Sequence, residues 1–280
     1  MHSPFRQIAR GIGFTEGPIR LGDGEIAVTS TSRGRVVHLA LDGAPETSML
    51  RQVETGGGPN GLAVDAAGRI LVMQNATFRT SSELPVRSGI QLIDGDDVAD
   101  LGIPDSVAPN DGAIGPDGAL WYTDPGRDAA RGLGPRVRRL DLATRETATV
   151  VDDVAFPNGL AFTPGGDRLV VADSHGHRLL SYPVVGAGLG AADVLVEIPG
   201  SDPDGIAFDA AGNLYVAAFA GDEVIVVDPA GGIAERIPTG EGSHPTNLCF
   251  AGERRTTLVV TLASGGRVVA FDDAPEGLAL

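Results

Sequence analysis

The chain has 280 residues, including 40 glycines and 19 prolines, and this abundance of turn formers argues against a helical bundle. Its 21 Lys and Arg residues are outnumbered by 37 Asp and Glu residues, and the net charge of −16 repels nucleic acid and anionic membranes. We therefore expect neither as a partner. The single cysteine, Cys249, excludes an intrachain disulfide and a cysteine-based zinc site.

The first residues, 1–10, lack the apolar stretch of a secretion signal, and no run approaches the 18 or so apolar residues of a membrane-spanning helix. A β-like segment, 5–12, comes next. From this composition and the lack of such apolar stretches we expect a soluble, cytoplasmic protein. We expect it to be a monomer or a homodimer and to act on a small molecule.

Six similar units then follow at intervals of about 40 to 50 residues, a period typical of propeller blades. Each unit begins with a proline before a short apolar run, at Pro18, Pro59, Pro109, Pro157, Pro203 and Pro245. The fourth unit, 157–185, is the clearest, with an apolar strand, a Gly/Asp turn, a second strand, a loop and a third strand. Turn motifs such as DAAGR and TPGGD supply the positive-φ residues that tight hairpins need.

These repeats predict an all-β, six-bladed β-propeller formed by one domain, residues 1–280, with four-stranded antiparallel blades around a central channel. The last unit ends after its third strand, at Phe271. We expect segment 5–12 to supply the missing outer strand and close the ring. Two stacked antiparallel sheets are the alternative that the pattern leaves open.

Polar residues recur where the innermost strand of each blade would begin, at one mouth of the channel. The residues directly after the prolines are Ile19, Asn60, Asn110, Asn158, Asp204 and Thr246, and Glu16 lies two residues before Pro18. An all-oxygen set of carboxylates and amides suits Ca²⁺ or Mg²⁺ better than Zn²⁺ or Cu²⁺. A simpler interpretation is that Asn and Asp only build the turn into the strand, although this does not explain Glu16.

The motifs FTEGP (14–18), PNGLAVDAAGRI (59–70), PNDGAIGPDGALWYTDP (109–125), PNGLAFTPGGDRLVVADS (157–174), PDGIAFDAAGNLYVA (203–217) and PTNLCFAGERRTTLVVT (245–261) follow in order. Together they resemble the gluconolactonase and senescence-marker-protein (regucalcin) family over all six units. The resemblance implies one axial divalent cation, with Glu16, Asn158 and Asp204 at the positions of its ligands. We expect Ca²⁺ first, with Mg²⁺, Zn²⁺, Mn²⁺ or Fe²⁺ as alternatives.

Family members hydrolyse aldonolactones, and relatives such as diisopropyl fluorophosphatase cleave organophosphates. The resemblance implies that Asn110 contacts metal or substrate, and Asn60 is a further candidate from the second blade. Animal lactonases carry a sugar-binding Arg where this chain has Ala108, so their substrate does not carry over. The form PND…WYTDP looks like bacterial gluconolactonases, and it makes Asp124 either a substrate contact or a buried turn carboxylate.

Two long loops, 75–88 and 124–136, return to the same mouth and predict a partial lid. They carry Arg79, Arg127 and Arg131, of which Arg127 is the candidate substrate contact, unless these arginines are only solvated. His175, in the fourth unit, is a further substrate-binding candidate. The roles of His177 and His244 stay open, and a second ion near His244 is one alternative to core packing.

The sequence thus predicts a metal-dependent lactonase or esterase, in which a cation polarises the carbonyl and activates water. Calcium acidifies water weakly, so a carboxylate is needed as general base, and Asp204 is the candidate, with Asp124 second. Three alternatives stay open: an organophosphate- or ester-cleaving enzyme, a carbon–carbon-bond-forming relative, and a non-catalytic binding module with structural calcium.

Overall fold

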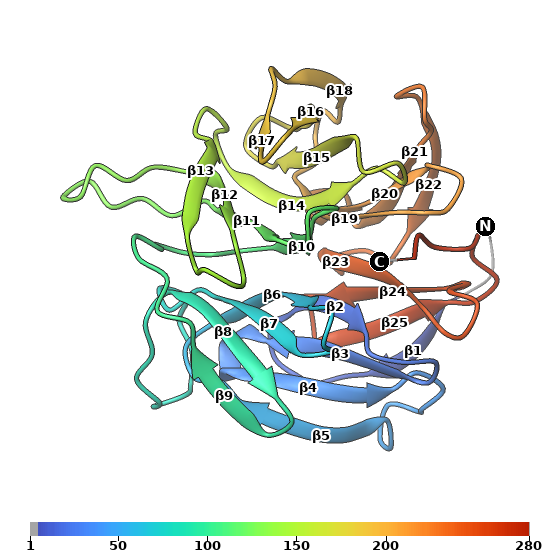
Figure 1. The fold of residues 1–280 in the computed structure, drawn as a ribbon. Helices are drawn as coiled ribbons and strands as arrows, with labels where there is room; N and C mark the ends of the chain where they lie inside the picture. Colours follow the sequence, from blue (N-terminus) through green and yellow to red (C-terminus); the bar gives the residue numbers. More distant parts are fainter. Residues whose placement is uncertain (1–4, 280) are drawn as a thin grey trace.

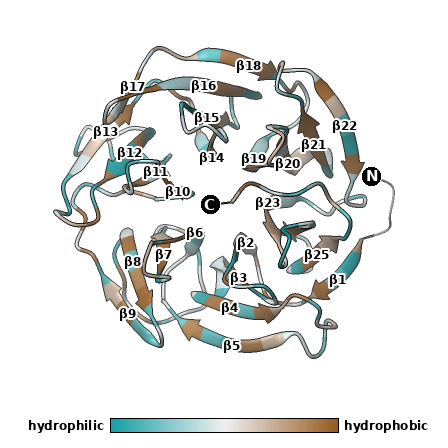
Figure 2. Cartoon of the chain, turned by 45° about the vertical axis from the view of Figure 1, so that its right-hand side comes forward, coloured by the Kyte–Doolittle hydropathy of each residue, from teal (hydrophilic) through white to brown (hydrophobic). Residues whose placement is uncertain are grey.

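In the computed structural model, which describes residues 5–279, six antiparallel sheets are arranged radially around a central channel (Figures 1 and 2). Each sheet is a blade, and the first strand of each sequence repeat lies innermost. The six-bladed β-propeller predicted from the repeats is therefore confirmed, and two stacked sheets are not what forms. No α-helix occurs between residues 5 and 279, and two short 3₁₀ turns, Thr31–Arg33 and Phe219–Gly221, follow second strands.

The strands of the first three blades follow one another along the chain. Blade 1 contains β2 (Thr15–Arg20), β3 (Glu25–Ser30), β4 (Arg35–Ala40) and β5 (Met49–Glu54). Blade 2 contains β6 (Pro59–Val64), β7 (Ile70–Gln74), β8 (Gly89–Asp94) and β9 (Asp97–Asp100). Blade 3 contains β10 (Gly112–Ile114), β11 (Leu120–Asp124), β12 (Arg136–Leu140) and β13 (Thr147–Val151).

The second half of the ring repeats this order, with one addition and one exchange. Blade 4 contains β14 (Pro157–Phe162), β15 (Arg168–Asp173), β16 (Arg178–Val185) and β18 (Asp193–Glu197), with the short β17 (Gly188–Leu189) beside β16. Blade 5 contains β19 (Pro203–Phe208), β20 (Leu214–Ala218), β21 (Glu223–Val227) and β22 (Ile233–Pro238). Blade 6 contains β23 (Pro245–Ala251), β24 (Thr257–Leu262), β25 (Arg267–Phe271) and β1 (Arg6–Ala9).

Strand β1 joins the two ends of the chain. It pairs antiparallel with β25, with Arg6 opposite Ala270 and Gln7 opposite Val269, and is the outermost strand of blade 6. The Arg6 guanidinium adds an ion pair of 2.8 Å to Asp272. This pairing covers the edge of β25, which would otherwise offer free backbone groups to another chain.

At the end of the channel opposite the mouth, glycine-containing turns join the inner strand of a blade to its second strand. The φ angles are 79° at Gly68, 74° at Gly118, 68° at Gly166 and 88° at Gly212, as the turn motifs predicted. Glycine adopts this left-handed backbone without steric cost. Asp65 and Asp209 hold two of these turns, because one carboxylate oxygen of each accepts two backbone N–H groups.

The apolar core of the described chain is divided into six clusters rather than one. Each cluster lies between two adjacent blades, for example Val28 and Leu39 of blade 1 with Val259 and Val268 of blade 6. Burial of these faces fixes each blade against its neighbours and leaves the inner strand ends to form the channel.

The C-terminal segment after β25 crosses the turn end of the channel. Its residue Gly277 pairs with Asp209, just beyond the end of β19, and Leu278 donates a backbone hydrogen bond of 3.1 Å to Phe208. Figure 2 shows this segment running to the centre of the ring. Since β19 spans roughly 20 Å, the tail lies at the channel end opposite the start of the inner strands. Within residues 5–279, no helix has the length and apolar character needed to cross a bilayer.

Candidate active site at the channel mouth

Six polar side chains surround the mouth of the channel, one from the start of each inner strand. We call them the axial ring, and its members are Glu16, Asn60, Asp111, Asn158, Asp204 and Asn247. In five blades the pairing of the inner strand is irregular over these first residues, for example between Glu16 and Ile19 and between Pro157 and Leu160. Such irregularities re-aim a side chain from the sheet face. All six side chains are buried, between 4% exposed at Glu16 and 9% at Asp204.

Glycine follows the ring residue in five of the six blades, and the packing of neighbouring inner strands explains why. A Cβ on Gly159 would lie 2.4 Å from the backbone oxygen of Asp204. A Cβ on Gly205 would lie 2.1 Å from the side chain of Asn247. Neither separation is sterically allowed, so only glycine permits adjacent inner strands to approach this closely. The glycines thereby bring the ring residues together.

Three carboxyl groups of the ring have raised pKa values. Burial, followed by the charge of Asp111, raises the pKa of Glu16 to about 8. Burial raises the pKa of Asp111 to about 6. Burial, then the charges of Glu16 and Asp111, raises the pKa of Asp204 well above its usual value. The mouth therefore concentrates negative charge in a dry environment that disfavours it, and a proton or a cation would relieve this.

The amide members of the ring bridge these carboxyls. Asn247 donates a hydrogen bond of 3.3 Å from its Nδ2 to Asp111 Oδ2, across 136 positions of sequence. Asn158 donates from its Nδ2 to Ser174 Oγ at 3.1 Å, and Ser174 in turn donates to the Pro203 carbonyl at 2.6 Å. With its nitrogen engaged, Asn158 has its Oδ1 left for a ligand. Asn60 Oδ1 is buried without a hydrogen-bond partner among the described residues.

These observations fit a hard cation. No three Asp, Glu, His or Cys side chains within residues 5–279 form a group that could hold a metal by themselves, so an ion would need amide oxygens as well. The axial ring supplies both kinds of oxygen. Its uncompensated negative charge and the orphaned Asn60 Oδ1 are the features that an oxygen-liganded cation such as Ca²⁺ would satisfy.

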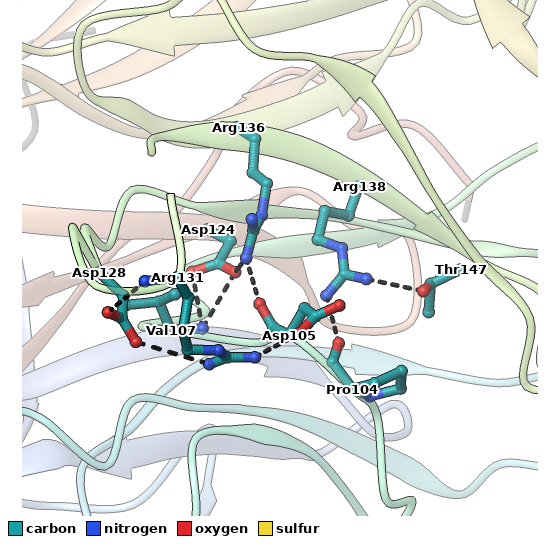
Figure 3. Close-up of polar contacts among 9 residues, drawn as sticks. All are labelled: Pro104, Asp105, Val107, Asp124, Asp128, Arg131, Arg136, Arg138 and Thr147. Carbon is teal, nitrogen blue, oxygen red and sulfur yellow. Dashed lines mark hydrogen bonds and ion pairs between the residues drawn. The ribbon is translucent and has the colours of Figure 1, made fainter. Parts of the chain in front are cut away.

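Asp124, at the end of β11, lies in a polar network beside the mouth rather than on its open surface (Figure 3). Its fully buried carboxylate accepts hydrogen bonds from Ala108 N at 2.7 Å and Val107 N at 3.1 Å, and forms an ion pair of 2.9 Å with Arg136. Arg136 also donates to the carbonyl of Asp105. Asp124 therefore fixes the segment that leads directly into Asn110 and Asp111.

The second layer of this network ties down the long loop 124–136. Arg131 forms ion pairs with Asp105 and with Asp128, the latter at 3.7 Å (Figure 3). Arg138 donates to the carbonyl of Pro104 at 2.9 Å and to Thr147 at 2.7 Å. One of the three lid arginines, Arg131, is thus engaged with protein groups.

The remaining candidates lie around the ring rather than in it. Asn110 is partly exposed and precedes the ring position of its blade; its backbone carbonyl accepts from Gly61 N at 2.6 Å. Arg127 is exposed on the loop 124–136. His175 is exposed beside Phe156, with ring centres 4.6 Å apart. His177 contacts the Ser201 carbonyl at 2.7 Å and Asp202 at 3.2 Å.

Two ring members, Asp111 and Asn247, escape an alignment on the prolines because they lie two residues after Pro109 and Pro245. The residue after Pro245, Thr246, is instead fully buried and donates to the Thr15 carbonyl at 2.8 Å. The signal that would have found Asp111 is the following glycine. Aligned on that glycine, Glu16 also falls into the same position as Asn60, Asn158 and Asp204.

Comparison with known proteins places these features in a family. Residues 14–264 match the family model described as SMP-30/Gluconolactonase/LRE-like region. A 6-deoxy-6-sulfogluconolactonase of Pseudomonas putida is 34% identical over 56% of this chain and 55% of its own length. The pentonolactonase XacC of Haloferax volcanii is 31% identical over 62% of this chain and 60% of its own. The chain thus spans less than two thirds of either lactonase.

Solved structures share the fold. A structure described as a putative gluconolactonase superposes with a TM-score of 0.80 at 24% identity, covering 100% of this chain and 95% of that one. A gluconolactonase from Xanthomonas campestris gives 0.78 at 22% identity, covering 94% and 87%. Since the family model spans nearly all of the propeller, the chain belongs to the SMP-30/gluconolactonase/LRE-like family.

Proposed function

We propose that this chain is a divalent-cation-dependent hydrolase that opens a small lactone at the axial ring. The observation that carries the proposal is the set of three buried carboxyls, Glu16, Asp111 and Asp204, with raised pKa values beside an unpartnered amide oxygen. Perturbed ionisable groups gathered in one recess are typical of catalytic sites. The names of two relatives, a sulfogluconolactonase and a pentonolactonase, support the substrate class.

The residues that would hold the cation are Glu16, Asn158 and Asp204, through two carboxylates and one amide oxygen. Ca²⁺ is our first choice because all three donors are oxygens. A bound cation would supply polarisation of the lactone carbonyl, which makes its carbon more electrophilic.

The chain's own groups account for the rest of the reaction. Asp204 accepts a proton as water attacks the carbonyl carbon, so that a new C–O bond forms. The ring C–O bond then breaks, the ring oxygen takes up a proton, and a hydroxy acid results. Asn60 and Asn110 orient the substrate, and Arg127 and His175 contact its outer part. Asp124 acts through the segment that it holds, 105–108.

The test is a metal-dependent substrate screen. Chelator-treated protein is assayed by pH drop against aldonolactones and aryl esters, without and with added CaCl₂. We expect hydrolysis only with the cation. Glu16→Gln should weaken Ca²⁺ binding, measured by calorimetry, and excess CaCl₂ should restore part of the rate. Glu46→Gln, at an exposed surface ion pair with Arg10, is the matched control and should change neither.

Each outcome decides between the alternatives. Hydrolysis that is equal with chelator and with CaCl₂ would refute the metal-dependent proposal. Ca²⁺ binding with a higher melting temperature, but without hydrolysis of any lactone or ester, would favour a binding module with a structural cation. Cleavage of an organophosphate such as diisopropyl fluorophosphate, but of no lactone, would place the chain nearer to the Loligo vulgaris diisopropyl-fluorophosphatase, which is 30% identical over 54% of this chain.

A further inference from the structure

A second circle of residues lies just outside the axial ring, at the opening of the mouth. We call it the rim, and it consists of Phe14, Gly58, Ala108, Phe156, Asp202 and His244. In five blades the rim carbonyl accepts a backbone hydrogen bond from the loop after a second strand, for example Ser174 N to Phe156 O at 3.1 Å and Ala263 N to His244 O at 2.9 Å. The rim positions are therefore equivalent around the channel.

Three rim residues form aromatic pairs with loops at the same mouth. Phe14 packs against Phe78, with ring centres 5.3 Å apart, and Phe156 packs against His175 at 4.6 Å. His244 stacks on Phe219 at 4.9 Å, with an interplanar angle of 19°. The pairs come from blades 1 and 2, from blade 4, and from blades 5 and 6. The four phenylalanines are partly buried.

The acidic side chains near these pairs already have partners. Asp202, the one acidic rim residue, lies 3.2 Å from His177. Asp222 accepts from the backbone N–H groups of Gly242 at 2.6 Å and His244 at 2.9 Å. No rim position carries Lys or Arg. A hydroxyl-rich substituent would thus lose water without gaining equivalent hydrogen bonds, whereas an apolar one gains from burial against the rings.

The negative charge of the chain also favours a neutral substituent. The net charge is −16, and three of the carboxyl groups counted in it lie buried in the axial ring below the rim. A carboxylated or sulfonated substituent would be repelled as it enters. The ring and the rim therefore make different demands, a polar reacting carbonyl below and a neutral apolar group above.

Resting on the lactonase function proposed above, we propose that the substrate is a neutral lactone bearing an aryl or alkyl substituent rather than a polyhydroxylated sugar lactone. The specificity-determining residues are Phe156 and Phe219, with their histidine partners. The reacting lactone ring lies at the axial ring and its apolar substituent lies against the aromatic pairs. Such a substituent contributes mainly to binding, and so to KM rather than kcat.

The experiment compares two five-membered lactones, γ-phenyl-γ-butyrolactone and D-ribono-γ-lactone, with the Ca²⁺-loaded protein. We expect kcat/KM to be about tenfold or more higher for the phenyl lactone. Phe156→Ala should raise KM for the phenyl lactone by about tenfold, with kcat and the ribonolactone constants nearly unchanged. Phe156→Leu keeps most of the volume without the aromatic face, and should fall between the two.

The matched control is Phe5→Ala, because Phe5 packs against Phe271 at 5.5 Å on the last blade, away from the rim. It should change neither lactone's constants. Preference for ribonolactone in the parent protein, or equal losses from Phe156→Ala and Phe5→Ala, would overturn the proposal.

A turnover-independent measurement separates this inference from the proposed function. If neither of these two lactones is hydrolysed, binding of the lactam 5-phenyl-pyrrolidinone is measured by calorimetry against ribonolactone. Tighter binding of the phenyl lactam that weakens in Phe156→Ala would still support an aromatic subsite. Equal binding of both compounds, unaffected by the substitution, would refute it.

Discussion

Acidic side chains occur at both ends of the channel, but their pKa values are shifted in opposite directions. At the turn end, burial acts to raise the pKa of Asp65, but hydrogen bonds from Arg69 and Ala67 outweigh it and lower that pKa. Asp117 likewise has a lowered pKa, because bonds from Arg139 and Trp121 outweigh its burial. At the mouth, Glu16 and Asp204 are buried beside other carboxyls, and their pKa values rise.

The difference teaches that partners, rather than residue type, separate a structural carboxylate from a reactive one. Asp65 has its donors within four residues of sequence, and Asp117 is compensated by Trp121 and Arg139 from the next two strands of its own blade. Each blade thus supplies the compensation for its own turn carboxylate. Each mouth carboxyl faces groups from other blades, and these include further acids. A cation from solution is the missing partner that the ring would accept.

The sharpest way to break this comparison is Asp204→Asn, which keeps the size of the side chain and removes the proposed base. We expect kcat/KM for the best lactone to fall by about 10²- to 10⁴-fold. The variant should remain folded by circular dichroism, since it removes a buried charge that lacks a partner. Wild-type activity in a folded, metal-binding Asp204→Asn protein would show that the base is elsewhere.

Asp124→Asn tests a carboxylate that lies near the mouth but is bonded like a turn-end one. Its loss leaves the buried Arg136 without a counter-charge, at a cost of about 3–5 kcal/mol of stability. Because Asp124 holds Val107 and Ala108, KM should also rise while kcat changes little. Urea unfolding and steady-state kinetics measure the two effects. An unchanged unfolding free energy would contradict the role of the ion pair.

Asp65→Ala makes the converse test in the turn of blade 2, at the end of the channel opposite Asp204. It removes the acceptor of two backbone N–H groups and of Arg69, so we expect a loss of about 1–3 kcal/mol in unfolding free energy. The value of kcat/KM should stay at the parent level. A large loss of activity with an unchanged unfolding free energy would contradict a purely structural role for Asp65.

The smallest expected effect concerns pH. The folded-state pKa of Glu16, about 8, lies above its ordinary value of 4.5, so the folded, metal-free protein retains a proton that the unfolded chain releases. This contribution to stability is full below pH 4.5 and is lost as pH rises towards 8. Added Ca²⁺ should therefore raise the melting temperature more at pH 8 than at pH 5.5, by roughly a few degrees. Glu16→Gln should flatten this difference; the same calcium-induced shift at both pH values would argue against the raised pKa.

The fold could be predicted because its evidence is local and repeated. A proline before an apolar run begins each of the six units, and a glycine-containing turn follows that run. Asn158 and Asp204 recur at the position after the proline, whereas Glu16 precedes its proline, and the family resemblance implies all three as cation ligands. Asp111 is missed because an alignment on the prolines puts Asn110 at that position, and only the glycine after Asp111 marks the start of pairing in the third blade, at Gly112.

Long-range contacts could not be predicted from the sequence for a different reason. The partners of Asp124 are backbone N–H groups of Val107 and Ala108, which have no side-chain signature. The same holds for the aromatic pairs of the rim, since Phe219 and His244 come from different blades. Only the curvature of the ring brings them into contact.

Because β1 supplies the outer strand of blade 6, the propeller cannot be finished in the order in which its chain is made. At synthesis rates of roughly 5–20 residues per second, β1 waits about 10 to 50 s for β25 to appear. During that interval five blades have their own strands, while the first strand made stays unpaired. A nascent chain that stalls before β25 would therefore expose β1 to pairing with another copy, and ring closure is the step at which assembly is most vulnerable.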